Sequence, residues 1–268
     1  MNVIEEAIVS IKEADVILIA AGAGMGVDSG LPDFRGDEGF WKEYPNLKEL
    51  GYSFEYIARP QSFEDDALLA WSFYGHRLEL YRDTTPHNGF KLLLDLVSKK
   101  EDYFIYTSNV DGQFQKAGFP EDKIYECHGS IHFVQCTKCK SGIKSAKNLD
   151  FKKNYFVPIC DKCNSSLRPN IMMFLDNNWD DSRSSEQFKR YTKFKRDATE
   201  RNKRIVVIEI GAGTEIPTVR HNSERLGMFN TRVIRINPRE DKINYDMGVG
   251  ISLGGLEAIN KIIGGING

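Results

Sequence analysis

Four cysteines limit most strongly the folds that this chain of 268 residues can adopt. They form two Cys-x-x-Cys pairs, Cys136 with Cys139 and Cys160 with Cys163, separated by 20 residues. Each pair can present two thiolates to one metal ion from a tight turn, and two pairs complete the tetrahedral shell of a structural zinc site. The pattern therefore predicts one structural Zn²⁺. Because a closed shell leaves no position for a substrate, we expect the reactive groups to lie elsewhere.

The composition is that of a globular chain with little net charge. Apolar residues make up 41% of the sequence, charged residues 28%, and the formal net charge is −2. The chain lacks the basic excess that drives nucleic-acid binding, so we expect no direct nucleic-acid binding. No apolar stretch reaches bilayer length, and we expect no membrane association. Zinc-bound thiolates and an odd fifth cysteine, Cys127, indicate a reducing compartment, hence the cytoplasm.

Alternating strand-like and helix-like patterns predict the larger part of the fold. Short apolar runs are typical of strands buried on both faces of a parallel sheet. Such runs lie at residues 15–20, 103–106, 204–210 and 231–236. Helical repeats lie at residues 3–13, 89–99, 184–202 and 253–263. We therefore expect an α/β fold with a doubly wound, Rossmann-like parallel sheet.

Two stretches interrupt this alternation and are predicted to form a smaller lobe. The helical insertion, about residues 40–85, spaces apolar residues three or four positions apart on one helix face. These are Ala67, Trp71, Tyr74, Leu78 and Tyr81. The second stretch, about residues 131–166, holds the cysteines and is too polar to form a core without the metal. We expect a single domain over residues 1–268 whose large lobe comprises about 1–39, 86–130 and 167–268.

A glycine-rich turn follows the first predicted strand. Gly22-Ala23-Gly24 resembles the start of a dinucleotide-binding fingerprint, but Val27 stands at the third glycine position. Small residues at a strand end let backbone N–H groups approach a pyrophosphate. A tight turn without any ligand explains the same residues equally well.

The loop that follows carries Asp33, Phe34 and Arg35 side by side. Pro32 disfavours a helix just before it, so these side chains are predicted to project over the mouth of the sheet. An acid, an aromatic ring and a guanidinium can contact a phosphate, a ribose or a nicotinamide ring. A loop stabilised by its own Asp–Arg pair is the alternative.

Polar side chains also follow the strand predicted at residues 103–106. Ser108, Asn109 and Asp111 lie beyond its carboxyl end, where open α/β sheets bind their ligands. In an extended backbone Asn109 and Asp111 point the same way. Both residue types are also common in turns, which leaves a purely structural role open.

A histidine, His128, lies between a short apolar segment and the cysteine-containing stretch, hence at the seam of the two lobes. Its ordinary pKa allows an imidazole to accept a proton near neutral pH, which suits a general base. A histidine in such a position also serves as a structural hydrogen-bonding group.

Taken together and in order, these motifs resemble those of sirtuins, in particular those of bacterial type. The resemblance covers about residues 14–260. Besides the cysteine pairs, it rests on Gly22-Ala23-Gly24, Gly30–Arg35, Thr107–Asp111, His128-Gly129-Ser130, Leu167-Arg168-Pro169, Gly211–Thr214 and Ile236-Asn237. It implies an NAD-dependent protein lysine deacylase with a Rossmann-like large lobe and an inserted small zinc-ribbon lobe.

The resemblance also implies roles for individual residues. NAD, a consumed co-substrate, would lay its pyrophosphate on Gly22, Ala23 and Gly24 and near Gly211, Gly213 and Thr214. Its adenosine would lie near Asn237, and its nicotinamide ribose beside Phe34, Asn109 and Asp111, with Asp33, Arg35 and Ser108 also in contact. The acyl-lysine oxygen would attack the ribose as nicotinamide leaves, with His128 as general base. Free lysine and an O-acyl-ADP-ribose would be the other products.

The resemblance extends to the acyl-lysine substrate. Tyr74 and Arg77 look like the Tyr-x-x-Arg signature of sirtuins that prefer succinyl or malonyl groups, because a guanidinium can pair with the distal carboxylate. The alternative is that Tyr74 completes the apolar helix face and Arg77 is solvated. Met172 and Phe174 belong to the strip that would line an acyl-lysine protein or peptide.

Five positions depart from the family pattern. Gly26 stands where the family has a serine or threonine, Ser108 where it has a glutamine, and Glu215 where it has a serine. Leu175-Asp176 stands in place of Gly-Glu. Two other functions therefore remain open: an NAD glycohydrolase or ADP-ribosyltransferase of the same fold, and a non-catalytic NAD sensor or zinc-dependent interaction module. The presence of His128 favours deacylation, because a base is needed after nicotinamide departs.

Overall fold

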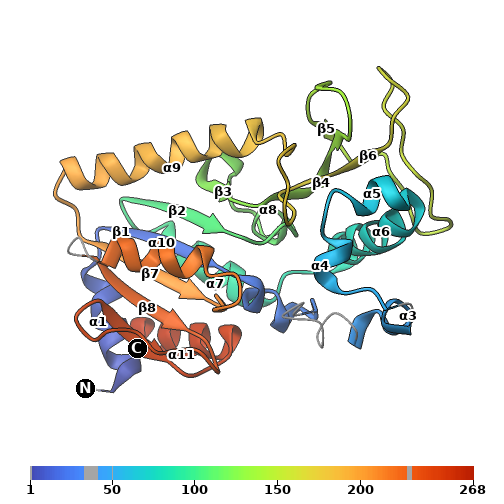
Figure 1. Ribbon diagram of the computed structural model, residues 1–268. Helices are drawn as coiled ribbons and strands as arrows, with labels where there is room; N and C mark the ends of the chain where they lie inside the picture. The colour runs from blue at the N-terminus through green and yellow to red at the C-terminus, as the bar shows by residue number, and fades with distance from the viewer. Residues whose placement is uncertain (1, 33–41, 50, 228–230) are drawn as a thin grey trace.

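The computed structural model describes residues 2–32, 42–49, 51–227 and 231–268. Its large lobe contains a six-stranded parallel sheet in the order β3-β2-β1-β7-β8-β9 (Figure 1). The strands are β1 (Val16–Ala21), β2 (Asp102–Thr107), β3 (Ile124–Glu126), β7 (Ile205–Ile210), β8 (Arg232–Ile236) and β9 (Gly248–Ile251). This order is that of a doubly wound sheet, and the direction of winding reverses between β1 and β7. The predicted α/β fold is confirmed.

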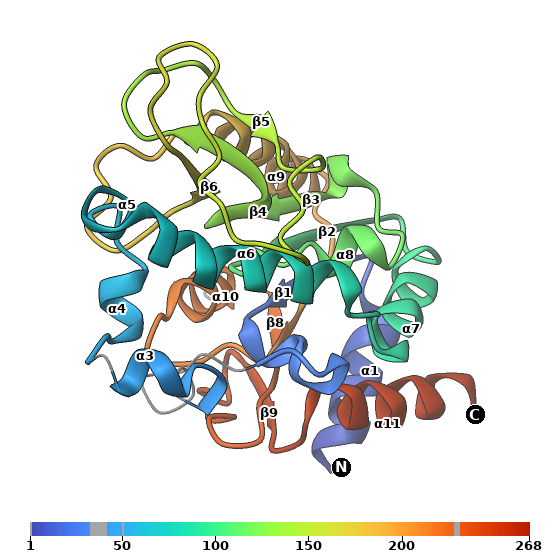
Figure 2. The same ribbon diagram turned by 90° about the vertical axis from the view of Figure 1, so that its right-hand side faces the viewer.

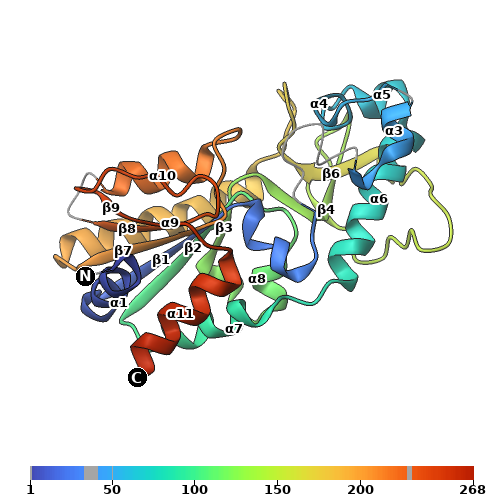
Figure 3. The same cartoon turned by 90° about the horizontal axis from the view of Figure 1, so that it is seen from below.

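Helices cover both faces of this sheet, as its strands require. On one face lie α1 (Val3–Glu13), α7 (Asn88–Val97), α8 (Gln113–Lys116) and α11 (Gly255–Asn267). On the other lie α9 (Ser182–Glu200) and α10 (Thr218–Gly227). Figure 3 shows the sheet between these two layers. All six residues of β1 are buried, because alternate side chains enter the two different cores.

Local sequence signals account for the start of helix α1, whereas they do not reveal strand β9. Helix α1 begins after Asn2, whose side chain accepts hydrogen bonds from the N–H groups of Ile4 and Glu5, while the Glu5 carboxylate accepts one from the Asn2 N–H. Strand β9 was not predicted, because two of its four residues are glycines. One of them, Gly248, packs so closely on β8 that a Cβ would lie 1.9 Å from the Val233 carbonyl oxygen. Because glycines are needed for this close approach, the strand has no apolar run by which it could be predicted.

The small lobe combines a group of helices with a three-stranded antiparallel sheet. The helices are α3 (Pro45–Glu49), α4 (Phe54–Ile57), α5 (Ser62–Asp65) and α6 (Ala67–Asp83). The sheet has the order β5-β4-β6, with β4 (Gly129–Cys136), β5 (Lys144–Ser145) and β6 (Leu167–Ile171). Figure 2 shows α6 running between this sheet and the large lobe.

One apolar core joins the two insertions. The Trp71 indole of α6 donates a hydrogen bond to the Leu167 carbonyl oxygen at 2.8 Å and stacks on the ring of Phe151. A Cβ at Gly75 would lie 2.7 Å from that ring, so the helix can approach only with glycine there. The cysteine-containing stretch is therefore supported by the aromatic face of α6. None of the described helices is long and apolar enough to cross a membrane.

Candidate functional site

A cavity of about 590 Å³ lies where the two lobes meet, beyond the carboxyl ends of β1, β2 and β7. This is the position at which doubly wound sheets bind ligands, because the winding reverses there. The lining contributed by the large lobe includes Gly22, Ala23, Ser108, Asn109, Val110, Asp111, His128, Gly211, Ala212, Gly213, Glu215, Ile216, Thr218 and Val219. The facing wall includes Phe54, Glu55, Ala58, Tyr74, Arg77, Tyr81, Met172, Met173 and Phe174.

The two glycine-rich turns at this edge pack against each other. A Cβ on Gly22 would lie 2.6 Å from the Gly211 carbonyl oxygen, and one on Gly211 would lie 2.4 Å from Met25 N. The Gly24 N–H donates to that same Gly211 oxygen at 3.0 Å. The glycines are therefore required for contact between the loops that follow β1 and β7. Of the predicted pyrophosphate contacts in these turns, Gly22, Ala23, Gly211 and Gly213 line the cavity.

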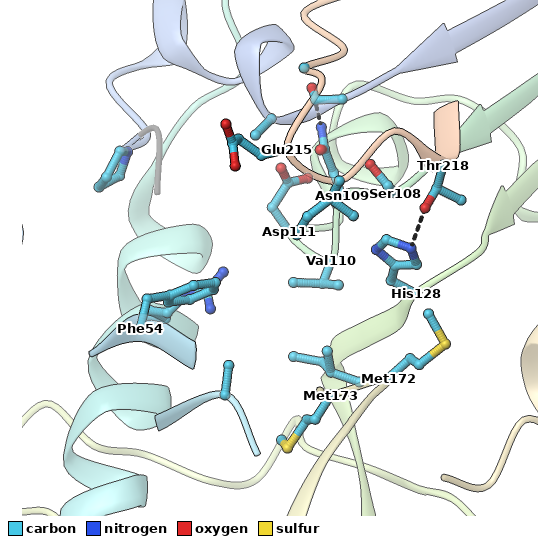
Figure 4. A pocket seen from close by; sticks show the side chains of 18 of the residues that line it. Phe54, Ser108, Asn109, Val110, Asp111, His128, Met172, Met173, Glu215 and Thr218 are labelled. Atoms are coloured by element: carbon cyan, nitrogen blue, oxygen red, sulfur yellow. Dashed lines mark hydrogen bonds between the residues drawn. The ribbon is translucent and has the colours of Figure 1, made fainter. Parts of the chain in front are cut away.

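The segment after β2 is fixed by hydrogen bonds to the neighbouring turn. The Asn109 amide donates to the Gly22 carbonyl oxygen at 3.0 Å, and the Asn109 N–H donates to the Thr107 hydroxyl. Asp111 is 9% exposed and accepts a hydrogen bond from the Gln113 N–H. Burial raises the pKa of the Asp111 carboxyl to about 6. Figure 4 shows Asn109 and Asp111 at the cavity together with His128.

His128 lies at the same cavity, with one contact on its ring and one on its backbone. Its Nε2 atom is 3.3 Å from the Thr218 hydroxyl at the start of α10, and its carbonyl oxygen accepts the Met172 N–H at 3.0 Å (Figure 4). Burial lowers the pKa of His128 to about 4. The imidazole is therefore neutral at physiological pH and able to accept a proton. Thr218 was not predicted, and no sequence pattern marks it.

The facing wall holds the predicted acyl and peptide contacts. Tyr74 and Arg77, both buried on α6, line the cavity together with Met172 and Phe174. The Phe174 N–H donates to the Ala58 carbonyl oxygen at 2.9 Å, which ties the strip after β6 to the loop after α4.

A buried ion pair anchors the same strip. The Arg168 guanidinium contacts the Asp176 carboxylate at 2.8 Å, with side chains 2% and 0% exposed. The Asp176 carboxylate also accepts the Met173 N–H. Leu175, predicted to stand in place of a glycine, has a positive φ of 56° and is 78% exposed. The ion pair holds the strip in place although its backbone adopts a conformation that non-glycine residues disfavour.

Among the described residues, three predicted NAD contacts lie outside the cavity lining: Gly24, Thr214 and Asn237. The N–H and hydroxyl of Thr214 both donate to the Glu240 carboxylate. Asn237 is 1% exposed; its amide donates to the Ala212 carbonyl oxygen and its side-chain oxygen accepts the Glu240 N–H. Thr214 and Asn237 therefore organise the loops after β7 and β8. Asp33, Phe34 and Arg35 lie outside the described residues.

The four cysteines form one cluster in the small lobe. Ideal tetrahedral zinc with Zn–S distances of about 2.3 Å places its sulfur atoms about 3.8 Å apart. The sulfur atoms of Cys136 and Cys163 are 3.5 Å apart, those of Cys139 and Cys160 are 3.7 Å apart, and all four lie within 4.8 Å of one another. The donor set therefore fits a single structural Zn²⁺. No cysteine in the described ranges lines the cavity.

The protein belongs to the Sir2 family, whose model matches residues 22–200. Among similar proteins, the NAD-dependent protein deacylase of Thermococcus sibiricus is 33% identical over 174 residues, which cover 64% of each chain. The NAD-dependent protein deacylase of Leptospira interrogans serovar copenhageni is 34% identical over 154 residues, 58% of each chain. The matches thus span less than two thirds of these relatives.

Solved structures agree in fold over nearly the whole length. A Sir2 homolog–NAD complex has a TM-score of 0.72 at 22% identity, covering 98% of this chain and 93% of that one. A structure described as the basis for the mechanism and regulation of Sir2 enzymes has a TM-score of 0.75 at 20% identity, covering 99% and 98%. At these identities the likeness shows the fold alone.

Proposed function

We propose that the protein is an NAD-dependent protein lysine deacylase. The observation that carries the proposal is that His128, Asn109 and Asp111 line one cavity at the reversal point of a doubly wound sheet. The deacylase names of the relatives and the NAD complex of a similarly folded Sir2 homolog support the same activity. The acylated substrate is a protein or peptide, and we place the enzyme in the cytoplasm.

The residues of the chain fit NAD as a consumed co-substrate. NAD supplies the ribose that accepts the acyl group as nicotinamide is released. The glycine turns allow close approach to the cavity edge, and the Asn109 amide is fixed by Gly22. Asp111, whose raised pKa lies near neutrality, can accept or donate a hydrogen bond at the nicotinamide end.

His128 would act as the general base. Its lowered pKa keeps the ring neutral, and its contact with the Thr218 hydroxyl restrains the ring orientation. A ribose hydroxyl that enters the cavity beside this ring can transfer its proton to the imidazole. The low pKa makes the isolated ring a weak base, so proton transfer depends on the charge that develops on the bound substrate.

Acyl-lysine would enter along the strip that contains Met172 and Phe174. The Arg168–Asp176 pair fixes this strip, and the hydrogen bond from Phe174 N–H to the Ala58 carbonyl oxygen ties it to the loop after α4 on the same wall. On the same wall of the cavity, Tyr74 and Arg77 provide hydrogen-bond donors, which suits acyl groups that end in a carboxylate. We therefore propose succinyl or malonyl lysine as substrates beside acetyl lysine.

The test is a mass-spectrometric assay of acetylated, succinylated and unmodified lysine peptides with NAD. We expect nicotinamide release only with acylated peptides, and a loss of at least about 100-fold in His128→Ala, because a positioned base contributes about that much. His221→Ala, which removes an exposed histidine of α10, is the matched control and should retain activity. Equal consumption of NAD by wild type and His128→Ala without peptide would refute deacylation and favour an NAD glycohydrolase.

A further inference from the structure

A third side chain of α6, Tyr81, stands beside Tyr74 and Arg77 at the cavity. Its spacing of four residues from Arg77 places both side chains on one face of the helix. The sequence pattern indicated only that Tyr81 extends the apolar helix face. The contacts of its hydroxyl group show a different role.

The phenol oxygen of Tyr81 accepts two hydrogen bonds from one guanidinium. Arg77 donates from Nε at 3.1 Å and from Nη2 at 2.5 Å. The guanidinium also lies within 5.2–5.8 Å of the ring centres of Phe73, Tyr74 and Tyr81. The two hydrogen bonds and the surrounding rings fix the orientation of Arg77.

Because a hydroxyl carries one donor and two acceptor lone pairs, this arrangement leaves the Tyr81 hydrogen directed away from Arg77. Among the described residues none accepts that hydrogen, although Tyr81 is only 5% exposed. A buried donor without an acceptor is costly and calls for a partner. Tyr74 shows the same pattern: it is 1% exposed, lines the cavity, and its hydroxyl bonds to no described residue.

Both phenols remain donors at neutral pH. Burial raises the pKa of Tyr74 to about 12, and burial likewise raises the pKa of Tyr81. One wall of the cavity thus carries two protonated hydroxyls and a guanidinium, three groups that donate hydrogen bonds.

We propose that Tyr81 is a specificity-determining residue that donates a hydrogen bond to the distal carboxylate of a dicarboxylic acyl group and holds Arg77 in position for that carboxylate. The inference rests on the proposed deacylase activity and adds a residue beyond the Tyr-x-x-Arg pair. An acetyl group has no carboxylate to accept this bond, so Tyr81 acts mainly on the choice between acyl groups.

The variant Tyr81→Phe tests this, because it removes only the hydroxyl. We expect the ratio of kcat/KM for a succinyl-lysine peptide to that for the matching acetyl-lysine peptide to fall about tenfold or more, as expected for loss of a hydrogen bond to a charged group. Tyr191→Phe is the matched control. It removes a buried phenol that donates to Asn222 at 2.9 Å within the large lobe, and it should leave the ratio unchanged.

A binding measurement separates this inference from the proposed activity. Fluorescence polarisation with labelled succinyl-lysine and acetyl-lysine peptides requires no turnover, and Tyr81→Phe should weaken only the preference for the succinyl peptide. If Tyr81→Phe changes both peptides equally, or changes neither, the inference is overturned while deacylation stands. If wild type turns over no acyl peptide, the proposed activity fails, and the binding preference alone decides the role of Tyr81.

Discussion

From the close contact between the two glycine turns we predict how much stability the variant Gly211→Ala loses. Gly211 has a φ of 63°, and a Cβ there would lie 2.4 Å from Gly24 C and 2.4 Å from Met25 N. These are backbone atoms held by the hydrogen bond from Gly24 N to Gly211 O, so they cannot move aside independently. The left-handed conformation costs about 1–2 kcal/mol and the overlap about 1–3 kcal/mol, about 2–5 kcal/mol in total.

Differential scanning calorimetry would measure this effect. At about 2–4 °C per kcal/mol for a domain of roughly this size, we expect Tm to fall by about 4–20 °C. Gly30→Ala is the control, because Gly30 has a φ of 85° and no atom of the described residues lies within 4 Å of the added Cβ. It should show only the conformational cost, about 1–2 kcal/mol. If both variants lower Tm equally, the close packing of the turns contributes nothing and the reasoning is wrong.

Three further predictions follow from the metal cluster, the histidine and the buried ion pair. Cys160→Ser should abolish binding of one zinc equivalent and lower Tm, whereas Cys127→Ser, outside the cluster, should retain the metal. Elemental analysis measures the zinc content and circular dichroism measures Tm. Full zinc content in Cys160→Ser would contradict the four-cysteine assignment. Folding keeps His128 neutral between its unfolded pKa of 6.5 and its folded pKa of about 4, so its contribution to stability is present above pH 6.5 and is lost as pH falls toward 4. Between pH 7 and pH 5 wild type should therefore lose about 2 kcal/mol more than His128→Ala in urea unfolding; parallel losses would exclude this effect. Asp176→Asn should destabilise the protein by about 3–5 kcal/mol and raise KM for the acyl peptide, because it leaves a buried arginine without its carboxylate. Asp161→Asn, in an ion pair whose side chains are 38% and 76% exposed, should change stability far less, because water screens this pair. Equal losses of stability in the two variants would argue against the buried pair.

The sequence predicted the parts of this fold that repeat a simple pattern. The run that forms β1 is apolar at every position because both faces of the strand are covered, and the cysteine spacing fits a four-sulfur cluster. Strand β9 was missed because its pairing depends on glycines and close backbone contact. Periodicity carries no information about such contacts.

The site shows a similar division. That Asn109, Asp111 and His128 lie at one cavity could be predicted, because each lies near a strand end and belongs to a recognisable motif; their roles stay predictions. The contacts of Thr218 and Tyr81 at the cavity could not be predicted, since they are made with side chains 90 and 4 positions away. A threonine at a helix start and a tyrosine in an apolar helix face are ordinary by sequence alone.

Sequence reasoning also could not anticipate contacts between loops that follow different strands. Thr214 was predicted to contact NAD, but its two donors bind the carboxylate of Glu240, a residue that follows a different strand. Its contact with NAD stays a prediction, and so does that of Asn237. Only the fold brings the loops after β7 and β8 together.

The entry and exit of the cysteine-containing stretch lie side by side. Met172 N–H bonds to the carbonyl oxygen of His128, and the next pairs along the ladder join Gly129 with Ile171 and Ser130 with Asn170. The 43 residues between His128 and Met172 thus begin and end at one place, where backbone hydrogen bonds join the two ends of the segment. Insertions or deletions in the part of this segment farthest from these hydrogen bonds need not displace His128. Homologous chains can therefore vary the size of the metal-bearing segment while the geometry at its base is preserved.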